Sequence, residues 1–155
     1  MKPTTILLLL FPAVLLFACK EQEKKATNPS LPLTGTWQLI SGTTITAGVP
    51  TVTDYTKSQR MIKIINNSHF SFLRHDINLP KDSANNFDAG GGSYTLAGDQ
   101  YTEHLDFYKD RNWEGKTFAF TVTINNDTLV QRGIEKVENA GIEREIIEKY
   151  VRAKE

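Results

Sequence analysis

The segment Thr117-Phe-Ala-Phe-Thr-Val-Thr-Ile124 alternates large apolar side chains with small or polar ones at every second position. One face therefore carries Phe118, Phe120, Val122 and Ile124. Such alternation, with many aromatic and β-branched residues, is typical of a strand that buries one face. Asn125-Asn-Asp127 then forms a turn into a second segment of the same kind, residues 128–132. The stretch predicts a β-hairpin and indicates an all-β fold.

The same pattern recurs along the chain from Leu33 onward. Strands are predicted at residues 34–46, 60–65, 69–76, 93–97, 100–108, 117–124, 128–132 and 142–152. Eight short strands joined by hairpin turns predict a sandwich or an eight-stranded up-and-down antiparallel barrel, and we expect the barrel. Residues 77–92 are expected to form a long loop, with Gly90-Gly91-Gly92 as a flexible lid or rim.

The last of these segments allows two interpretations. The positions of Ile142, Ile146 and Tyr150 fit helical spacing, and Glu and Lys fill most of the intervening positions. As a strand, the segment would place these three side chains on one face together with Arg144, Glu148 and Arg152. A barrel needs a closing strand to remove its open edges, and we therefore expect a strand.

The Gly98-Asp99 turn sets a predicted register for its hairpin. A two-residue turn pairs Leu96 with Tyr101 and Tyr94 with Glu103. The inward face would then carry Tyr94, Leu96, Tyr101, Glu103, Leu105 and Phe107. The outward face would carry Thr102, His104, Asp106 and Tyr108. In the preceding strand, Arg74 shares a face with Phe70 and Phe72, so we expect a buried ion pair between Arg74 and Glu103.

The N-terminus looks like a targeting segment. Lys2 is followed by an apolar run over residues 6–18, shorter than the roughly 20 residues that a spanning helix needs. We expect a signal peptide over residues 1–18. Residues 19–32 are charged, or rich in Asn, Ser and Pro, and are expected to form a flexible tether. The folded domain is then expected over residues 33–155.

Cys19 stands where the apolar run ends. Leu16-Phe-Ala-Cys19 resembles the bacterial lipobox, whose cysteine is acylated and becomes the new N-terminus. The resemblance implies lipid attachment at Cys19. Several acyl chains would anchor the protein stably in a membrane. The expected location is the bacterial cell envelope, at the outer membrane, with the membrane as a partner through this anchor.

Gly35-Thr-Trp37 on the first predicted strand resembles the G-x-W signature of lipocalins. The wider set Leu33-Thr-Gly-Thr-Trp-Gln-Leu39, Gly92-Ser-Tyr-Thr-Leu96, Tyr101-Thr-Glu103 and Gly115-Lys-Thr-Phe118 resembles lipocalin-like lipoproteins of Bacteroidetes. The resemblance implies a barrel closed at one end by Trp37, packed under Arg152 or Arg144. It implies no particular ligand or reaction.

Composition excludes some classes of function. The chain has 155 residues, with 18 Lys plus Arg against 18 Asp plus Glu, so nucleic acid is not an expected partner. The single cysteine allows no intrachain disulfide. The three histidines lack the spacing of a metal site, and no motif indicates a cofactor or catalytic residue. Trp113, in the turn over residues 109–115, is expected to cover one barrel end or to be an exposed contact.

Three functions remain open at this point. The first is a binding module for a small apolar or amphipathic ligand, and its candidate ligand-binding residues are Phe72, Arg74, Tyr94, Tyr101, Glu103, Phe118 and Phe120. The second is a small enzyme that uses Glu103 and Arg74, with Glu103 as a base. The third is an envelope protein with a filled core and only protein partners. A binding module is the expectation, because a few polar groups inside an apolar barrel suit ligand orientation.

Overall fold

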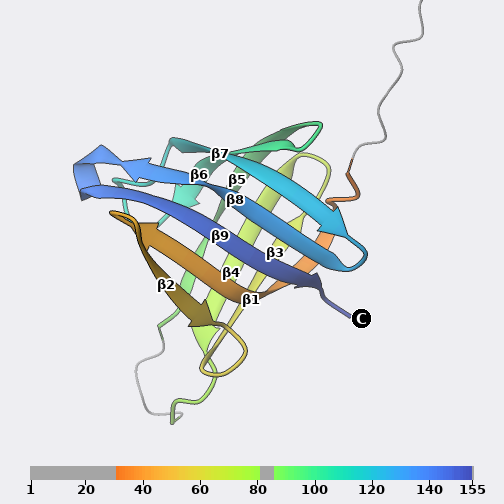
Figure 1. Cartoon of the computed structure of the whole chain (residues 1–155), viewed down its shortest axis with the longest axis horizontal. Coiled ribbons are helices and arrows are strands. Elements are labelled where there is room, and N and C mark those ends of the chain that lie inside the picture. The colour runs from red at the N-terminus through yellow and green to blue at the C-terminus, as the bar shows by residue number, and fades with distance from the viewer. Residues whose placement is uncertain (1–30, 81–85, 155) are drawn as a thin grey trace, which may run out of the picture.

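The computed structural model describes residues 31–80 and 86–154, which form nine antiparallel strands (Figure 1). They are β1 (Gly35–Thr46), β2 (Val49–Asp54), β3 (Gln59–Ile65), β4 (His69–Asp76), β5 (Asp88–Ala97), β6 (Gln100–Tyr108), β7 (Lys116–Asn125), β8 (Thr128–Val137) and β9 (Ile142–Arg152). Pairing of β1 with β9 closes an eight-stranded barrel, to which β2 is an addition. The predicted all-β barrel is confirmed. The predicted signal peptide, Cys19 and all but the last two residues of the tether lie outside the described residues.

Strand β9 resolves the ambiguity of the last segment. It pairs with β8 on one side and with β1 on the other, and the prediction of a closing strand is confirmed. Both edges of β9 thus find backbone hydrogen-bond partners, which outweighs the local helical pattern. None of the described residues forms a helix long and apolar enough to cross a membrane.

Strand β2 was not predicted from the sequence. It follows a two-residue turn at Ala47-Gly48, where both residues have positive φ. Strand β1 pairs with β3 only as far as Gln38 and pairs with β2 from Ser41 onward. The C-terminal part of β1 and the N-terminal part of β3 are therefore not joined by backbone hydrogen bonds. We call this gap in the barrel the seam. Tyr55, whose amide donates to the Ile40 carbonyl, lies at this seam.

Strand β5 begins at Asp88, so the predicted lid at Gly90-Gly91-Gly92 is wrong: these glycines lie within the strand. In the pairing of β5 with β6, Gly92 lies opposite two residues of β6, Leu105 and Asp106. This is a β-bulge. A Cβ atom at Gly92 would lie 1.8 Å from the His104 carbonyl oxygen, so the close approach of the two strands requires glycine there.

The bulge reverses the faces predicted for the end of β6. Phe107 was expected inside but is 69% exposed. Tyr108 was expected to face water but is half-buried and packs against the core. The reason is the extra residue, which shifts the alternation by one position. The rest of the predicted register is confirmed, with Leu96 opposite Tyr101 and Tyr94 opposite Glu103.

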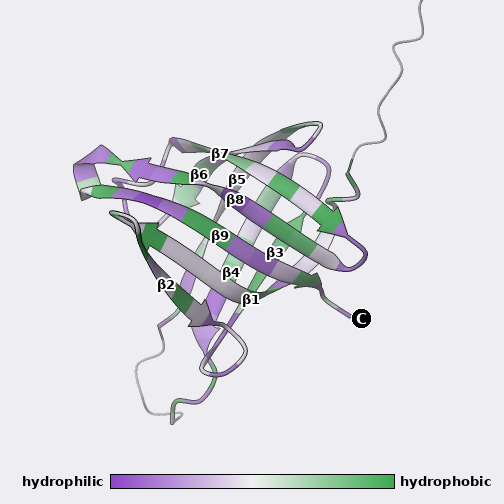
Figure 2. Cartoon of the chain, viewed as in Figure 1, coloured by the Kyte–Doolittle hydropathy of each residue, from purple (hydrophilic) through white to green (hydrophobic). Residues whose placement is uncertain are grey.

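One end of the barrel is closed around Trp37. The indole is fully buried, and its Nε1 donates to the Leu33 carbonyl at 2.7 Å. The Arg152 guanidinium lies 4.1 Å from the centre of the Trp37 ring and donates to the Pro32 and Thr34 carbonyls. Apolar side chains fill this half of the barrel, among them Leu39, Ile65, Phe70, Tyr101, Phe120, Val122, Leu129 and Tyr150. Figure 2 shows hydrophobic and hydrophilic residues in bands along the strands.

Candidate functional site

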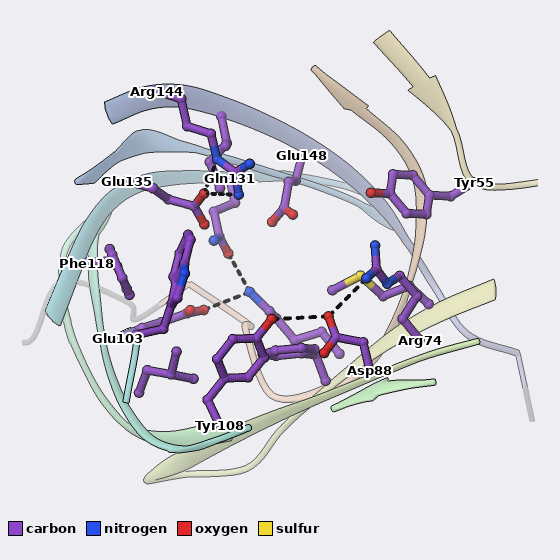
Figure 3. A pocket seen from close by; sticks show the side chains of 16 residues that line it. Tyr55, Arg74, Asp88, Glu103, Tyr108, Phe118, Gln131, Glu135, Arg144 and Glu148 are labelled. Atoms are coloured by element: carbon purple, nitrogen blue, oxygen red, sulfur yellow. Dashed lines mark hydrogen bonds and ion pairs between the residues drawn. The ribbon is translucent and has the colours of Figure 1, made fainter. Parts of the chain in front are cut away.

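A cavity of about 190 Å³ occupies the other half of the barrel (Figure 3). It lies between the filled core and the end of the barrel at which β4, β6 and β8 finish and β5, β7 and β9 begin. Its lining combines aromatic, aliphatic and ionisable side chains. The lining residues are Tyr55, Met61, Lys63, Phe72, Arg74, Asp88, Glu103, Leu105, Tyr108, Trp113, Phe118, Gln131, Glu135, Arg144, Ile146 and Glu148.

Three buried polar side chains form the floor of the cavity. Lys63 of β3 donates to Glu103 of β6 at 2.7 Å and to Gln131 of β8 at 3.0 Å. Their exposed fractions are 3%, 7% and 2%. The Lys63 Nζ atom also lies between 5.5 and 5.9 Å from the ring centres of Phe70, Tyr101 and Tyr150. A buried ammonium needs such compensation, because desolvation disfavours its charge.

Asp88 organises one side of the cavity mouth. Arg74 lies directly opposite it in the β4–β5 pairing and donates to its carboxylate at 3.0 Å. Tyr108 also donates to Asp88, at 3.3 Å, and the more exposed Lys109 lies 3.1 Å away. Burial raises the pKa of Tyr108, and the neighbouring Asp88 charge adds to that rise. The phenol therefore stays a hydrogen-bond donor.

A second ion pair lines the mouth on the opposite wall. Glu135 of β8 and Arg144 of β9 are opposite each other in the register and approach to 2.6 Å. Burial raises the pKa of Glu135, and the nearby Arg144 charge opposes this effect. The Arg144 guanidinium also lies 5.6 Å from the centre of the Trp113 ring, so Trp113 is held beneath it.

Glu148 points into the cavity from β9, opposite Gln131 in the register (Figure 3). Its carboxylate accepts a hydrogen bond from the Tyr150 hydroxyl at 2.6 Å. Burial raises the pKa of Tyr150 well above its ordinary value, and the charge of Glu148 contributes to that rise. Glu148 thus has a neutral donor as its partner.

Aromatic rings line one wall without interruption. Ring centres are 6.0 Å apart for Phe72 and Tyr108, 6.3 Å for Tyr108 and Trp113, and 5.7 Å for Trp113 and Phe118. These distances lie in the range at which aromatic pairs attract each other. We call this set of four side chains the aromatic wall. It gives the cavity an apolar surface facing the charged groups.

Comparison with known proteins bears on the fold. The sequence matches no protein-family model and no curated protein. A lipocalin-like protein from Bacteroides uniformis has a similar structure. The match covers 78% of this chain and 98% of that protein, with 18% sequence identity and a TM-score of 0.50. At this identity the likeness concerns the fold alone.

The lipocalin-like barrel brings some of the predicted ligand-binding residues to the cavity and not others. Phe72, Arg74, Glu103 and Phe118 line it. The remaining three lie outside the lining: Phe120 and Tyr101 are in the buried core, and Tyr94 packs 5.1 Å from the Tyr101 ring. Arg152 lies over Trp37 at the closed end of the barrel, while Arg144 lies at the cavity mouth.

The predicted ion pair between Arg74 and Glu103 is wrong. Arg74 pairs with Asp88 at the mouth, and Glu103 pairs with Lys63 at the floor. The cause is the true start of β5, which places Asp88 directly across from Arg74. Arg74 and Glu103 thus line the same cavity, but each is paired with a different charged residue.

Sequence reasoning missed Lys63, Gln131 and Glu135 as interior residues. Lys63 lies between Ile62 and Ile64, and the strand carries apolar residues on both faces, so its sequence does not select the inner one. Glu135 lies beyond the predicted end of its strand. Gln131 shares a face with Leu129, so the alternation of the strand could have predicted that Gln131 points inward.

Proposed function

We propose that this protein is a lipid-anchored protein of the bacterial envelope whose lipocalin-like barrel binds a small amphipathic ligand. The observation that carries the proposal is the cavity of about 190 Å³, with its aromatic wall on one side and ionisable groups around it. Ligand sites commonly combine an apolar lining with a few placed polar groups in this way. The fold is compatible with the proposal, because eight-stranded barrels can hold one small ligand.

The size of the cavity limits the ligand. A protein cavity of roughly 150 Å³ can hold benzene, whereas pockets for drug-sized molecules measure about 300–1,000 Å³. The cavity here therefore suits a molecule the size of a single ring with a short substituent. An amphipathic ligand is favoured over a wholly apolar one, because the Glu148 carboxylate would otherwise lose water without gaining a counterion.

The lipid anchor is proposed from the sequence. Cys19 follows an apolar run at the position expected for lipobox processing, and charged or polar residues follow it as far as Lys25. An acylated Cys19 would hold the barrel near a membrane surface, with residues 19–32 as the spacer. The ligand would then be captured in the envelope.

A matched pair of variants tests binding in the cavity. Ile146 lines the cavity on β9, and Ile134 lies on the outer face of the barrel on β8. Ile146→Phe should fill the space and abolish binding, whereas Ile134→Phe should bind as the parent protein does. Native mass spectrometry of the three purified proteins, with a panel of small aromatic alcohols, acids and amines, measures this. Equal binding by both variants would remove the cavity as the site, and no binding by any protein would refute the proposed function.

A further inference from the structure

The charged groups that line the cavity are not all paired, although Asp88 has a second cation beside it, Lys109, at 3.1 Å. The lining contains Lys63, Arg74 and Arg144 as cations, and Asp88, Glu103, Glu135 and Glu148 as anions. Each cation already has a carboxylate partner within 3.0 Å. Glu148 is the carboxylate left over.

Glu148 makes no ion pair with any residue that the structure describes. Its recorded partner is the Tyr150 hydroxyl, which neutralises none of its charge. Its negative charge is felt by its neighbours, because it contributes to raising the pKa of Tyr101, Glu135 and Tyr150. A cavity with one uncompensated carboxylate attracts positive charge more strongly than the same carboxylate in open water would.

The aromatic wall adds a second attraction of the same sign. Ring faces are negative, and cations bind to them within about 6 Å of the ring centre. The guanidinium of Arg144 already lies 5.6 Å from the ring centre of Trp113 in this wall, and below the cavity floor the ammonium of Lys63 lies at a similar distance from Phe70 and Tyr150 of the core. The barrel interior thus accommodates cations in two places through its own side chains.

Other ligand charges fit less well. An anion would have to displace a carboxylate from one of the three paired cations. A metal ion would need several oxygen or nitrogen ligands, and the described residues contain no group of three His, Cys, Asp or Glu side chains that could hold one. A neutral ligand would leave Glu148 without a counterion after water is displaced.

We propose that the ligand is a small organic cation whose ammonium group pairs with Glu148 and whose apolar body lies against the aromatic wall. This inference rests on the proposed function, which it narrows to amines and quaternary ammonium compounds of about the size of one ring and a short chain. Tyr150 acts as a positioning residue, because its hydroxyl holds the Glu148 carboxylate in place.

Three probes of one shape test the charge preference. Calorimetric titration of the full-length protein with 2-phenylethylamine, 2-phenylethanol and phenylacetate, near neutral pH, compares a cation, a neutral molecule and an anion. We expect the amine to bind about tenfold or more tightly than the alcohol, and the acid to bind weakest. If the alcohol binds as well as the amine, the inference fails while the proposed function stands. If none of the three binds, the inference fails together with the function on which it rests.

Three variants, one of them a control, locate the effect. Glu148→Gln keeps the side-chain length and an acceptor for Tyr150, and should reduce amine affinity about tenfold while leaving the alcohol unchanged. Glu143→Gln is the control, because Glu143 lies on the same strand but faces the outside of the barrel. It should change the affinity for neither the amine nor the alcohol. Trp113→Leu removes one ring of the aromatic wall, at a position in the β6–β7 loop. It should weaken binding of the amine more than binding of the alcohol. Amine affinity unchanged in both Glu148→Gln and Trp113→Leu would overturn the inference.

Discussion

The ammonium of Lys63 and the carboxylate of Glu103 meet at 2.7 Å across the inside of the barrel. Their strands, β3 and β6, are not neighbours in the sheet, and Gln131 of β8 accepts a further hydrogen bond from Lys63. The three residues therefore connect walls that backbone hydrogen bonds do not join. They also separate the filled half of the barrel from the cavity.

Removing one member of this floor should be costly. Lys63→Met deletes the cation and leaves the Glu103 carboxylate buried without a counterion, which should lower the free energy of unfolding by about 3–5 kcal/mol. Adding Glu103→Leu should recover much of the loss, because no buried charge is then left alone. Urea denaturation of the single and double variants measures both effects.

A surface pair serves as the control for this experiment. Lys136 and Glu143 lie 3.2 Å apart on the outside of β8 and β9. Lys136→Met should change stability by no more than about 1 kcal/mol, since exposed pairs contribute little. A similar cost at both lysines would show that the floor is solvated.

Loss of the hydroxyl group should affect the stability of the protein differently at two buried tyrosines. The Tyr101 hydroxyl is buried near Glu103 but forms no well-aligned hydrogen bond among the described residues, whereas the Tyr150 hydroxyl donates to Glu148. Tyr101→Phe should therefore be neutral or stabilising. Tyr150→Phe should cost about 1.5–3 kcal/mol, the range for a hydrogen bond to a charged group. Thermal and urea unfolding of the two variants decide this, and a larger loss at Tyr101 would contradict it.

Stability should fall in alkaline solution. Burial raises the pKa of Tyr101 and of Tyr150 in the folded state above the ordinary value of 10.0. The unfolded chain then releases these protons first, so the stabilising contribution is complete below about pH 10 and is lost as the pH rises further. Each tyrosine should contribute a slope of up to about 1.4 kcal/mol per pH unit. Urea titrations across this range check the slope, and Tyr150→Phe should reduce it.

Substitutions at Gly35 and Gly48 should distinguish the stability cost of a steric contact from the cost of backbone strain. Both have positive φ, but a Cβ atom at Gly35 would lie 2.5 Å from Arg152 Nη1, and one at Gly48 would meet nothing within 4 Å. Gly48→Ala should cost about 1 kcal/mol through backbone strain alone. Gly35→Ala should cost more, because it also displaces the guanidinium from Trp37. Equal losses in denaturation experiments would show that the closure by Arg152 adds little.

Acylation at Cys19 is a prediction from the sequence. Cys19→Ala should abolish labelling by a palmitate analogue and release the protein from the membrane fraction. Lys20→Ala, one position further on, should leave both unchanged. Continued labelling of the Cys19 variant would refute the anchor.

The barrel could be predicted from the sequence because alternation is strong where one face is buried, as at Phe118, Phe120 and Val122. The Gly98-Asp99 turn fixed the register of its hairpin in the same local way. Strand β2 was missed because Val49 and Val52 are both exposed, so burial imposes no pattern there. Pro50 also argues against a strand, although an edge position tolerates it.

The site was less predictable because it depends on long-range pairing. Asp88 lies in a polar stretch without local pattern, and its partner Arg74 is decided by the β4–β5 register. Ile64 is 41% exposed while Lys63 is buried, the reverse of their hydropathy. The buried position of Lys63 is stable only because Glu103 and Gln131, which lie on strands distant in the sequence, accept hydrogen bonds from it. The sequence placed Glu148 on the same face as Ile146 and Tyr150 once its segment was considered as a strand.

The extra residue in β6 also makes the chain length at this point independent of what the cavity contains. Asp106 and Phe107 both face outward, so the inward side chains resume at Tyr108. Deleting Asp106 would restore even pairing with β5 and leave Phe107 outside and Tyr108 inside, because these two residues already pair with Gly91 and Gly90. Asp88 would thus keep the phenol that donates to it. A strand of this barrel can therefore lose one residue here without a change in the side chains that its cavity presents.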